Sequence, residues 1–146
     1  IFFCSARRSG SCAPPVVGLD PANFLVAEGA SGERLGFGQV RPLGASAAGA
    51  ALLASLFVVE GARRRGVGSA LVRGLLARRA AASLRGPVYA LTLAPKRPFF
   101  ERLGFAVVGP DQEGGLPAGL AVEASLGRIV APAVAGEDLV VLRLEE

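Results

Sequence analysis

The 146-residue sequence predicts one α/β domain, in which a sheet is flanked by helices. First, 51% of the residues are apolar, so a domain of this size can bury a core. Second, short apolar runs of strand length alternate with two segments of helical spacing. Third, the third of these runs leads through a glycine-containing turn directly into the first helical segment. No internal repeat and no long linker divides the chain.

The first half of the domain is expected to contain three strands and one helix. Residues 24–28 and 35–40 form a predicted hairpin around the turn residues 29–33. Residues 51–59 are almost continuously apolar, as in a central strand. A helix then follows, with Arg73 on its polar side. The apolar stripe of this helix consists of Val67, Leu71, Val72, Leu75 and Leu76.

The second half continues the alternation of strands and helices. Strands are predicted at residues 88–93, 105–108 and 139–144, and a short helix at 96–103 is expected to end at Gly104. Residues 116–130 have partly helical spacing, which is weakened by residues that disfavour helix interiors. Those residues are Pro117, Gly119 and Gly127.

The turn between the 51–59 strand and the following helix predicts an anion site at residues 64–69. The first N–H groups of a helix lack intrahelical partners, and the helix dipole adds positive potential there. Gly66 and Gly68 allow a phosphate to approach the backbone, and the adjacent arginines add charge. A dinucleotide-binding turn is excluded because Leu71 stands at the position of its third glycine. A triphosphate-binding loop is excluded because no Gly-Lys-Ser/Thr follows the turn.

Two motifs resemble those of the GNAT N-acetyltransferase superfamily. Arg63-Arg64-Arg65-Gly66-Val67-Gly68 matches the family's Arg/Gln-x-x-Gly-x-Gly/Ala signature, and residues 99–105, Phe-Phe-Glu-Arg-Leu-Gly-Phe, resemble its Phe-Tyr-Glu-Lys-Leu-Gly-Phe. The resemblance implies a GNAT-like acyl-CoA N-acyltransferase fold over residues 18–146, with a central mixed, mostly antiparallel sheet flanked by helices. Residues 36–43 and 53–56 look most like uncharacterised plant and cyanobacterial members.

The resemblance also implies acetyl-CoA as co-substrate. Its pyrophosphate would lie on the N–H groups of residues 65–69, its pantetheine arm would pair with the end of the 51–59 strand, and a gap beside residues 88–93 would admit it. The implied cofactor-binding residues are Leu56, Phe57, Val58, Arg63, Arg64, Arg65, Gly66, Val67, Gly68 and Ser69.

The chain departs from the family at its acid–base positions. Phe100 stands where the family commonly has a tyrosine acid, and Leu52 where it often has a glutamate. Ser55 either lines the cleft or fills a core position, and Glu60 is interpreted as a solvated turn residue. Direct attack by an amine then relies mainly on positioning, which can supply several powers of ten in rate.

Composition narrows the function further. The absence of histidine excludes Ser–His and Cys–His catalysis, and two cysteines alone cannot form an ordinary zinc site, so no metal is expected. The net charge of +4 comes from arginine, with Lys96 the only lysine, in an Ala/Gly-rich sequence that indicates compositional bias. No run of 18 unbroken apolar residues occurs, so a membrane span is not expected.

Three functions follow from these observations. The leading one is acetyl transfer to a primary amine of a small molecule or protein, and the alternative is a catalytically weak or inactive acyl-CoA-binding module. The third, a nucleic-acid-binding domain, is set aside because the excess of arginine indicates compositional bias, so no nucleic-acid partner is expected. Residues 1–17, with Cys4 and Cys12 as free thiols, are compatible with the end of an organelle transit peptide or with a truncated first element. An intracellular, plastid location and a monomer or homodimer are the corresponding expectations.

Overall fold

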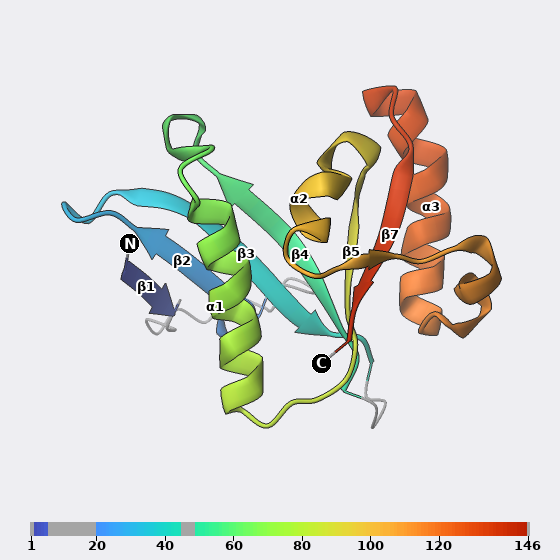
Figure 1. Cartoon of the computed structure of the whole chain (residues 1–146), viewed down its shortest axis with the longest axis horizontal. Helices are drawn as coiled ribbons and strands as arrows, with labels where there is room; N and C mark the ends of the chain where they lie inside the picture. Colours follow the sequence, from blue (N-terminus) through green and yellow to red (C-terminus); the bar gives the residue numbers. More distant parts are fainter. Residues whose placement is uncertain (1, 6–19, 45–48, 146) are drawn as a thin grey trace. The chain divides into compact units, whose positions relative to one another are not determined.

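The computed structural model describes residues 2–5, 20–44 and 49–145, which fold as two compact units (Figure 1). The first unit comprises Ile1–Arg41 and Leu53–Leu84, and the second comprises Pro42–Leu52 and Arg85–Glu146. The units are therefore interleaved along the chain, and each is described by itself.

The first unit contains neighbouring strands in the order β1-β2-β3-β4. β2 pairs antiparallel with both β1 and β3, and Leu25 of β2 lies opposite Gly38 of β3. Two 3-10 turns, η1 (Pro21–Asn23) and η2 (Glu60–Ala62), precede β2 and α1 respectively. The bounds of the longer elements are β1 Phe2–Ser5, β2 Phe24–Glu28, β3 Arg34–Pro42, β4 Ala51–Val58 and α1 Val67–Ala81.

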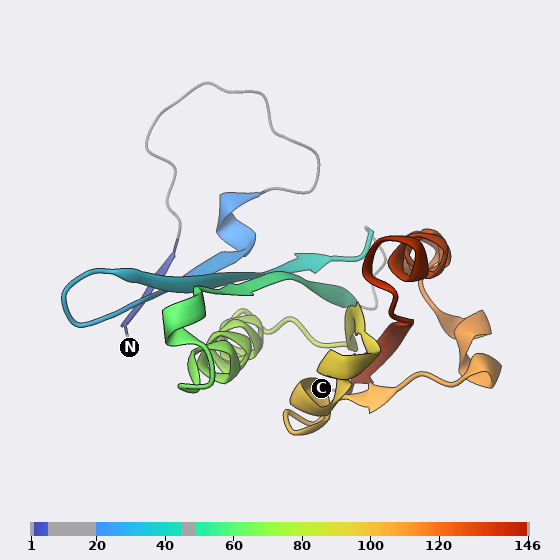
Figure 2. The same ribbon diagram turned by 90° about the horizontal axis from the view of Figure 1, so that it is seen from above.

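Helix α1 covers one face of these strands (Figure 2). Its predicted stripe is confirmed for the four residues Val67, Leu71, Val72 and Leu75, which are buried, whereas Leu76 is half-buried. Gly38 makes room for the helix, because a Cβ atom there would lie 3.0 Å from Leu75 Cδ1. Near the other end of α1, Arg78 donates hydrogen bonds to the carbonyls of Phe24 (3.0 Å) and Ala22. This arginine ties the helix to the start of β2.

The second unit contains strands in the order β5-β7-β6, all antiparallel. β5 and β7 pair over all six residues, from Val88 opposite Leu144 to Leu93 opposite Leu139. α3 packs on β7, with Leu120 and Ala124 fully buried. The element bounds are β5 Val88–Leu93, η3 Ala94–Lys96, α2 Arg97–Glu101, β6 Ala106–Val107, η4 Pro110–Gly115, α3 Ala118–Ala135 and β7 Leu139–Leu144.

Two helical predictions for this unit need correction. The helix expected at 96–103 is the five-residue α2, because Pro95 lies in the preceding 3-10 turn and Pro98 occupies the first turn of the helix. The weak helix expected at 116–130 is the 18-residue α3, which begins only after Pro117 and includes Gly127, where packing on β7 leaves no space for a side chain. Gly104 follows α2 with a φ of +93°, as expected for a helix-ending glycine.

Residues 42–52, which connect β3 to β4 and include the start of β4, belong to the second unit. Ala51 N–H donates to the Pro87 carbonyl at 3.0 Å, which holds the start of β4 beside the segment leading into β5. Gly49 has a φ of +63°, and a Cβ atom there would lie 1.8 Å from the Arg85 carbonyl oxygen. Both the backbone conformation and this close approach require glycine at position 49.

The expected leader is only partly described. Phe2–Ser5 forms strand β1, whose four residues pair with Leu25–Glu28. The rest of residues 1–17, including Cys12, lies outside the described residues.

Candidate functional site

The glycine turn that precedes α1 leaves a helix N-terminus open to solvent. Gly66 is the N-cap residue with a φ of +81°, and a Cβ atom placed there would meet nothing within 4 Å. The first intrahelical bond joins Ala70 N–H to the Gly66 carbonyl at 2.9 Å. The N–H groups of residues 67–69 therefore have no acceptor within the helix, and together they form an anion-binding end.

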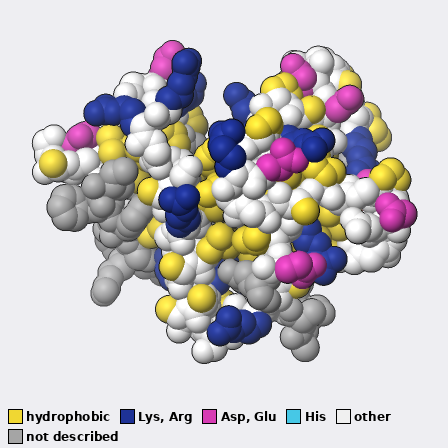
Figure 3. Space-filling view, in the orientation of Figure 1, with side chains coloured by type: hydrophobic (Ala, Val, Ile, Leu, Met, Phe, Trp, Pro, Cys, Tyr) yellow, Lys and Arg dark blue, Asp and Glu magenta, His cyan; other side chains and the backbone are white. Residues whose placement is uncertain are grey.

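The three arginines of the turn are all exposed, and Figure 3 shows basic side chains gathered above this end of α1. Arg63 Nε donates to the Val58 carbonyl at 3.0 Å, so this side chain braces the end of β4. Arg65 Nη1 makes a long contact of 3.5 Å with the Gly61 carbonyl. Within the described part of the chain, Arg64 makes no hydrogen bond or ion pair, and its φ is +58°. Its guanidinium is the one most available to a ligand.

The end of β4 presents backbone groups in two directions. A Cβ atom on Gly36 would lie 2.4 Å from the Phe57 carbonyl oxygen, and Val59 N–H donates to the Leu35 carbonyl at 2.9 Å. Phe57 and Val59 therefore direct their polar groups toward β3. Since successive residues of a strand alternate, Leu56 and Val58 direct theirs away from β3. Of the predicted residues Leu56, Phe57 and Val58, only Leu56 and Val58 therefore direct backbone groups away from β3. The Val58 carbonyl already accepts a hydrogen bond from Arg63.

Ser55 lies immediately before this edge. It is exposed and has a φ of +53°, a conformation that is uncommon for residues other than glycine. The Ser55 side chain therefore does not fill a core position, and the backbone is locally irregular within β4. Leu52, at the position of the family's glutamate, is 3% exposed and has no polar group to offer.

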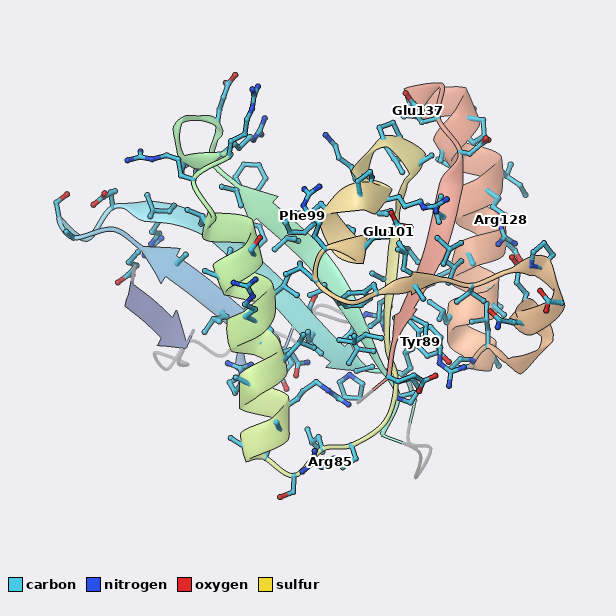
Figure 4. The ribbon with its side chains drawn as sticks, viewed as in Figure 1. Arg85, Tyr89, Phe99, Glu101, Arg128 and Glu137 are labelled. Atoms are coloured by element: carbon cyan, nitrogen blue, oxygen red, sulfur yellow. The ribbon has the colours of Figure 1, made fainter. Side chains whose placement is uncertain are left out.

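Phe100 is a packing residue of the second unit. Its side chain is 6% exposed and makes edge-to-face contacts with Phe99 and Phe105, at centroid distances of 5.0 and 5.7 Å. Figure 4 shows Phe99 on the same short helix, α2. Phenylalanine cannot donate a proton, so this position supplies apolar contacts and no acid.

The loop between β2 and β3 contributes a carboxylate near the turn. Hydrogen bonds from Ser31, above all from its hydroxyl at 2.6 Å, lower the pKa of Glu33, and Arg65 adds a smaller favourable charge interaction. Glu33 is fully exposed, so it remains an ordinary solvated anion at neutral pH. It partly offsets the positive potential that Arg65 adds to the turn.

The hydrogen bond from Arg63 to the Val58 carbonyl was not predicted from the sequence, because no local sequence pattern indicates that a side chain bonds to the preceding strand. The fold also gives the only tyrosine, Tyr89, a structural position: it is 3% exposed and Arg143 lies over its ring at 5.8 Å. Across the described ranges, no three His, Cys, Asp or Glu side chains come together as metal ligands would.

A search among curated proteins found no match. Among solved structures, N-acetylglutamate synthase from Neisseria gonorrhoeae, complexed with coenzyme A and N-acetylglutamate, is 18% identical with a TM-score of 0.62, over 86% of this chain and 26% of that chain. Rv2747 from Mycobacterium tuberculosis, in complex with coenzyme A, is 22% identical with a TM-score of 0.62, over 86% and 77%. The chain thus spans about a quarter of the synthase.

A third solved structure, a GNAT-family acetyltransferase from Staphylococcus aureus Mu50, is 16% identical with a TM-score of 0.58, over 83% of this chain and 65% of that chain. These likenesses confirm the predicted α/β fold class. The model of the acetyltransferase (GNAT) domain matches residues 20–107, which include the glycine turn and both sequence motifs. This match covers more than half of the sequence, and the chain therefore belongs to the GNAT acetyltransferase domain family.

Proposed function

We propose that this chain transfers an acetyl group from acetyl-CoA to a primary amine of a small molecule or a protein. The observation that carries the proposal is the exposed N-terminus of α1, where the N–H groups of residues 67–69 lie next to the unpaired Arg64. Acetyl-CoA as the cofactor is supported by the family to which the chain belongs and by the coenzyme A bound in two of the matched structures.

Two parts of the cofactor have matching groups in the first unit. The pyrophosphate binds the N–H groups at the start of α1, with Arg64 and Arg65 adding charge. The pantetheine amides pair with the outward backbone groups of Leu56 and with the Val58 N–H, as an added strand would. Arg63 acts indirectly, because it holds the Val58 carbonyl.

The reaction needs no covalent intermediate with the protein. The lone pair of a neutral amine attacks the thioester carbonyl, a C–N bond forms, and the C–S bond breaks to release the coenzyme A thiolate. The amine loses one proton and the thiolate gains one, so the transfer balances with water as carrier. Phe100 and Leu52 cannot take part in this proton transfer, and the rate depends on positioning the two reactants.

The same two residues favour a second candidate, an acyl-CoA-binding module with weak or no catalysis. Where a proton donor and a base are both absent, loss of general acid–base catalysis typically costs on the order of a hundredfold or more for each group. Such a module would keep the cofactor turn and bind acetyl-CoA without using it. The two candidates therefore make the same binding prediction and differ only in turnover.

The test combines binding with turnover on one protein sample. Calorimetry measures the Kd for coenzyme A, and thiol release from acetyl-CoA is followed with a panel of small amines and amino-terminal peptides. The no-amine reaction is the control, because it measures simple thioester hydrolysis. Amine-dependent thiol release with a matching acetylated product supports the transferase. Tight binding without such release across the panel supports the module, and absence of binding contradicts both.

A further inference from the structure

α3 lies beyond the residues that match the family model, and one side of it anchors it to the second unit. Leu120 and Ala124 are buried against the unit, and a Cβ atom on Gly127 would lie 2.7 Å from Leu139 of β7. These positions recur every three or four residues and therefore form one helix face. That face accounts for how α3 is held.

A second face of the same helix carries large apolar side chains that nothing in the described structure covers. Their spacing of four, three, one and four residues places them along one stripe of the helix. The exposed fractions are 60% for Val122, 59% for Leu126, 72% for Ile129, 54% for Val130 and 81% for Val134. Monomeric soluble proteins rarely expose a contiguous apolar patch larger than a few hundred Å².

Glu123, which is half-buried, lies within the angular range of this stripe, between the directions of Val130 and Val134. The other polar side chains of α3 lie at the edges of the stripe or away from it. Arg128 is directed to η4 (Figure 4), where its guanidinium forms an ion pair with Glu113. Ser125 donates its hydroxyl to the Ala121 carbonyl at 2.8 Å within the helix. Gly119 and Ala133, which are small and exposed, lie between the large side chains. Apart from Glu123 the stripe is uncharged, and its small residues allow close approach of another helix.

A bilayer does not explain the stripe. Among the described residues, α3 is long and apolar enough to cross a membrane, with 18 residues, a mean hydropathy of 1.4 and only 11% of them buried. β7 nevertheless runs back along it and pairs with β5 over its whole length, and Arg143 of β7 pairs with Ala106 of β6. The strands that precede and follow the helix in the chain, β6 and β7, are thus held in one sheet. If α3 crossed a membrane, the paired strands β6 and β7 would have to separate from the sheet or enter the bilayer as well.

We propose that the α3 stripe, residues 122–134, binds the same stripe of a second copy of this chain in a two-fold dimer. The five exposed side chains offer roughly 500 Å² of apolar surface on each copy, so pairing them buries about 1,000 Å² in total, the size at which specific interfaces begin. A predominantly apolar stripe is complementary to itself, which a two-fold contact requires. Val122, Leu126, Val130 and Val134 form an i+4 ridge, and two such ridges interdigitate at a crossing angle of about −50°.

The test is the oligomeric state of three proteins under reducing conditions. Sedimentation velocity is measured from low to several hundred micromolar for wild type, Ile129→Lys and the control Leu84→Lys. Ile129 lies midway along the length of the stripe, whereas Leu84 is an apolar residue of the first unit that is 49% exposed. Wild type and Leu84→Lys should dimerise reversibly. Ile129→Lys should raise the dimer Kd by at least about thirtyfold, as expected for a lost hot-spot residue.

At concentrations low enough to keep both proteins monomeric, Ile129→Lys should have the wild-type circular dichroism and thermal midpoint, because the side chain is 72% exposed in the single chain. Wild type that stays monomeric throughout the concentration range would overturn the proposal. So would a dimer that survives both Ile129→Lys and Leu126→Lys. Flotation of monomeric wild type with neutral phosphatidylcholine vesicles would assign the stripe to a lipid surface and would likewise overturn it.

Discussion

At the scale of single residues, Arg64 combines an unfavourable backbone conformation with the most available charge of the turn. Its φ of +58° costs on the order of 1 kcal/mol for a residue other than glycine. Arg64→Gly should therefore stabilise the free protein by about 1 kcal/mol and weaken coenzyme A binding at the same time. Urea unfolding and calorimetry measure the two effects.

Ser83 provides the matched control, because its φ is +56° and it follows the other end of α1. Ser83→Gly should give a similar gain in stability and leave the Kd for coenzyme A unchanged. Equal binding by Arg64→Gly and Ser83→Gly would show that Arg64 does not contact the cofactor.

Gly68 tests the backbone site itself. It lies in the first turn of α1, where a branched side chain would occupy the space of a bound phosphate. Gly68→Val should weaken coenzyme A binding by about tenfold or more while the protein still folds. Ala77→Val, at an exposed position later in the same helix, introduces the same side chain away from the turn. If both variants bind coenzyme A like wild type, the cofactor is held elsewhere.

At the scale of elements, the β2–β3 hairpin loop carries a pH dependence of known sign. The hydroxyl of Ser31 lowers the pKa of Glu33. A carboxylate with a lowered folded pKa adds stability above its unfolded value of about 4.3, and this stability is lost as the pH falls through the folded pKa. Ser31→Ala should raise the pKa of Glu33 toward the unfolded value, as measured by NMR titration of its carboxyl group.

The same variant should unfold at a lower urea concentration than wild type at pH 7, and the difference should vanish in acid, where Glu33 is protonated in both proteins. A difference that persisted in acid would mean that Ser31 stabilises the loop independently of Glu33. Ser125→Ala is a suitable control, because its hydroxyl bonds to a backbone carbonyl and not to a titrating group.

Elements with strong local signals were predictable from the sequence. The strands at 24–28, 88–93 and 139–144 have the expected bounds, since the first two apolar runs end at turn-forming residues and the third ends at acidic residues. α3 was underestimated because glycine and proline predict breaks from local propensity, whereas packing of Gly127 on Leu139 depends on the tertiary fold. The glycine turn before α1 was also predictable, because Gly66 and Gly68 are a local sequence signal.

The finer geometry of the candidate site was not predictable in this way. Which backbone groups of β4 face outward depends on its pairing with β3, and the bond from Arg63 to Val58 depends on a side-chain rotamer. Ser55 shows the same limit: its exposure follows from the positive φ within β4, which no local pattern reveals.

At the scale of the whole molecule, a cofactor that binds only the folded chain must raise its thermal stability. Acetyl-CoA at a hundred times its Kd should add about 2.7 kcal/mol, which corresponds to a shift of roughly 5–10 °C in Tm for a chain of this length. Differential scanning fluorimetry measures the shift. Gly68→Val should shift less at the same concentration, and the absence of any shift in folded wild type would contradict the proposed cofactor.

The interleaving of the two units along the chain has a consequence for biosynthesis. The first unit cannot close until residue 84 has emerged from the ribosome, and by then residues 42–52 have emerged as well. Leu43 and Leu52, which end up buried in the second unit, must wait for Arg85–Glu146 while exposed to other nascent chains. The interval between residue 52 and the last strand is therefore the stage of synthesis at which this protein most needs a chaperone.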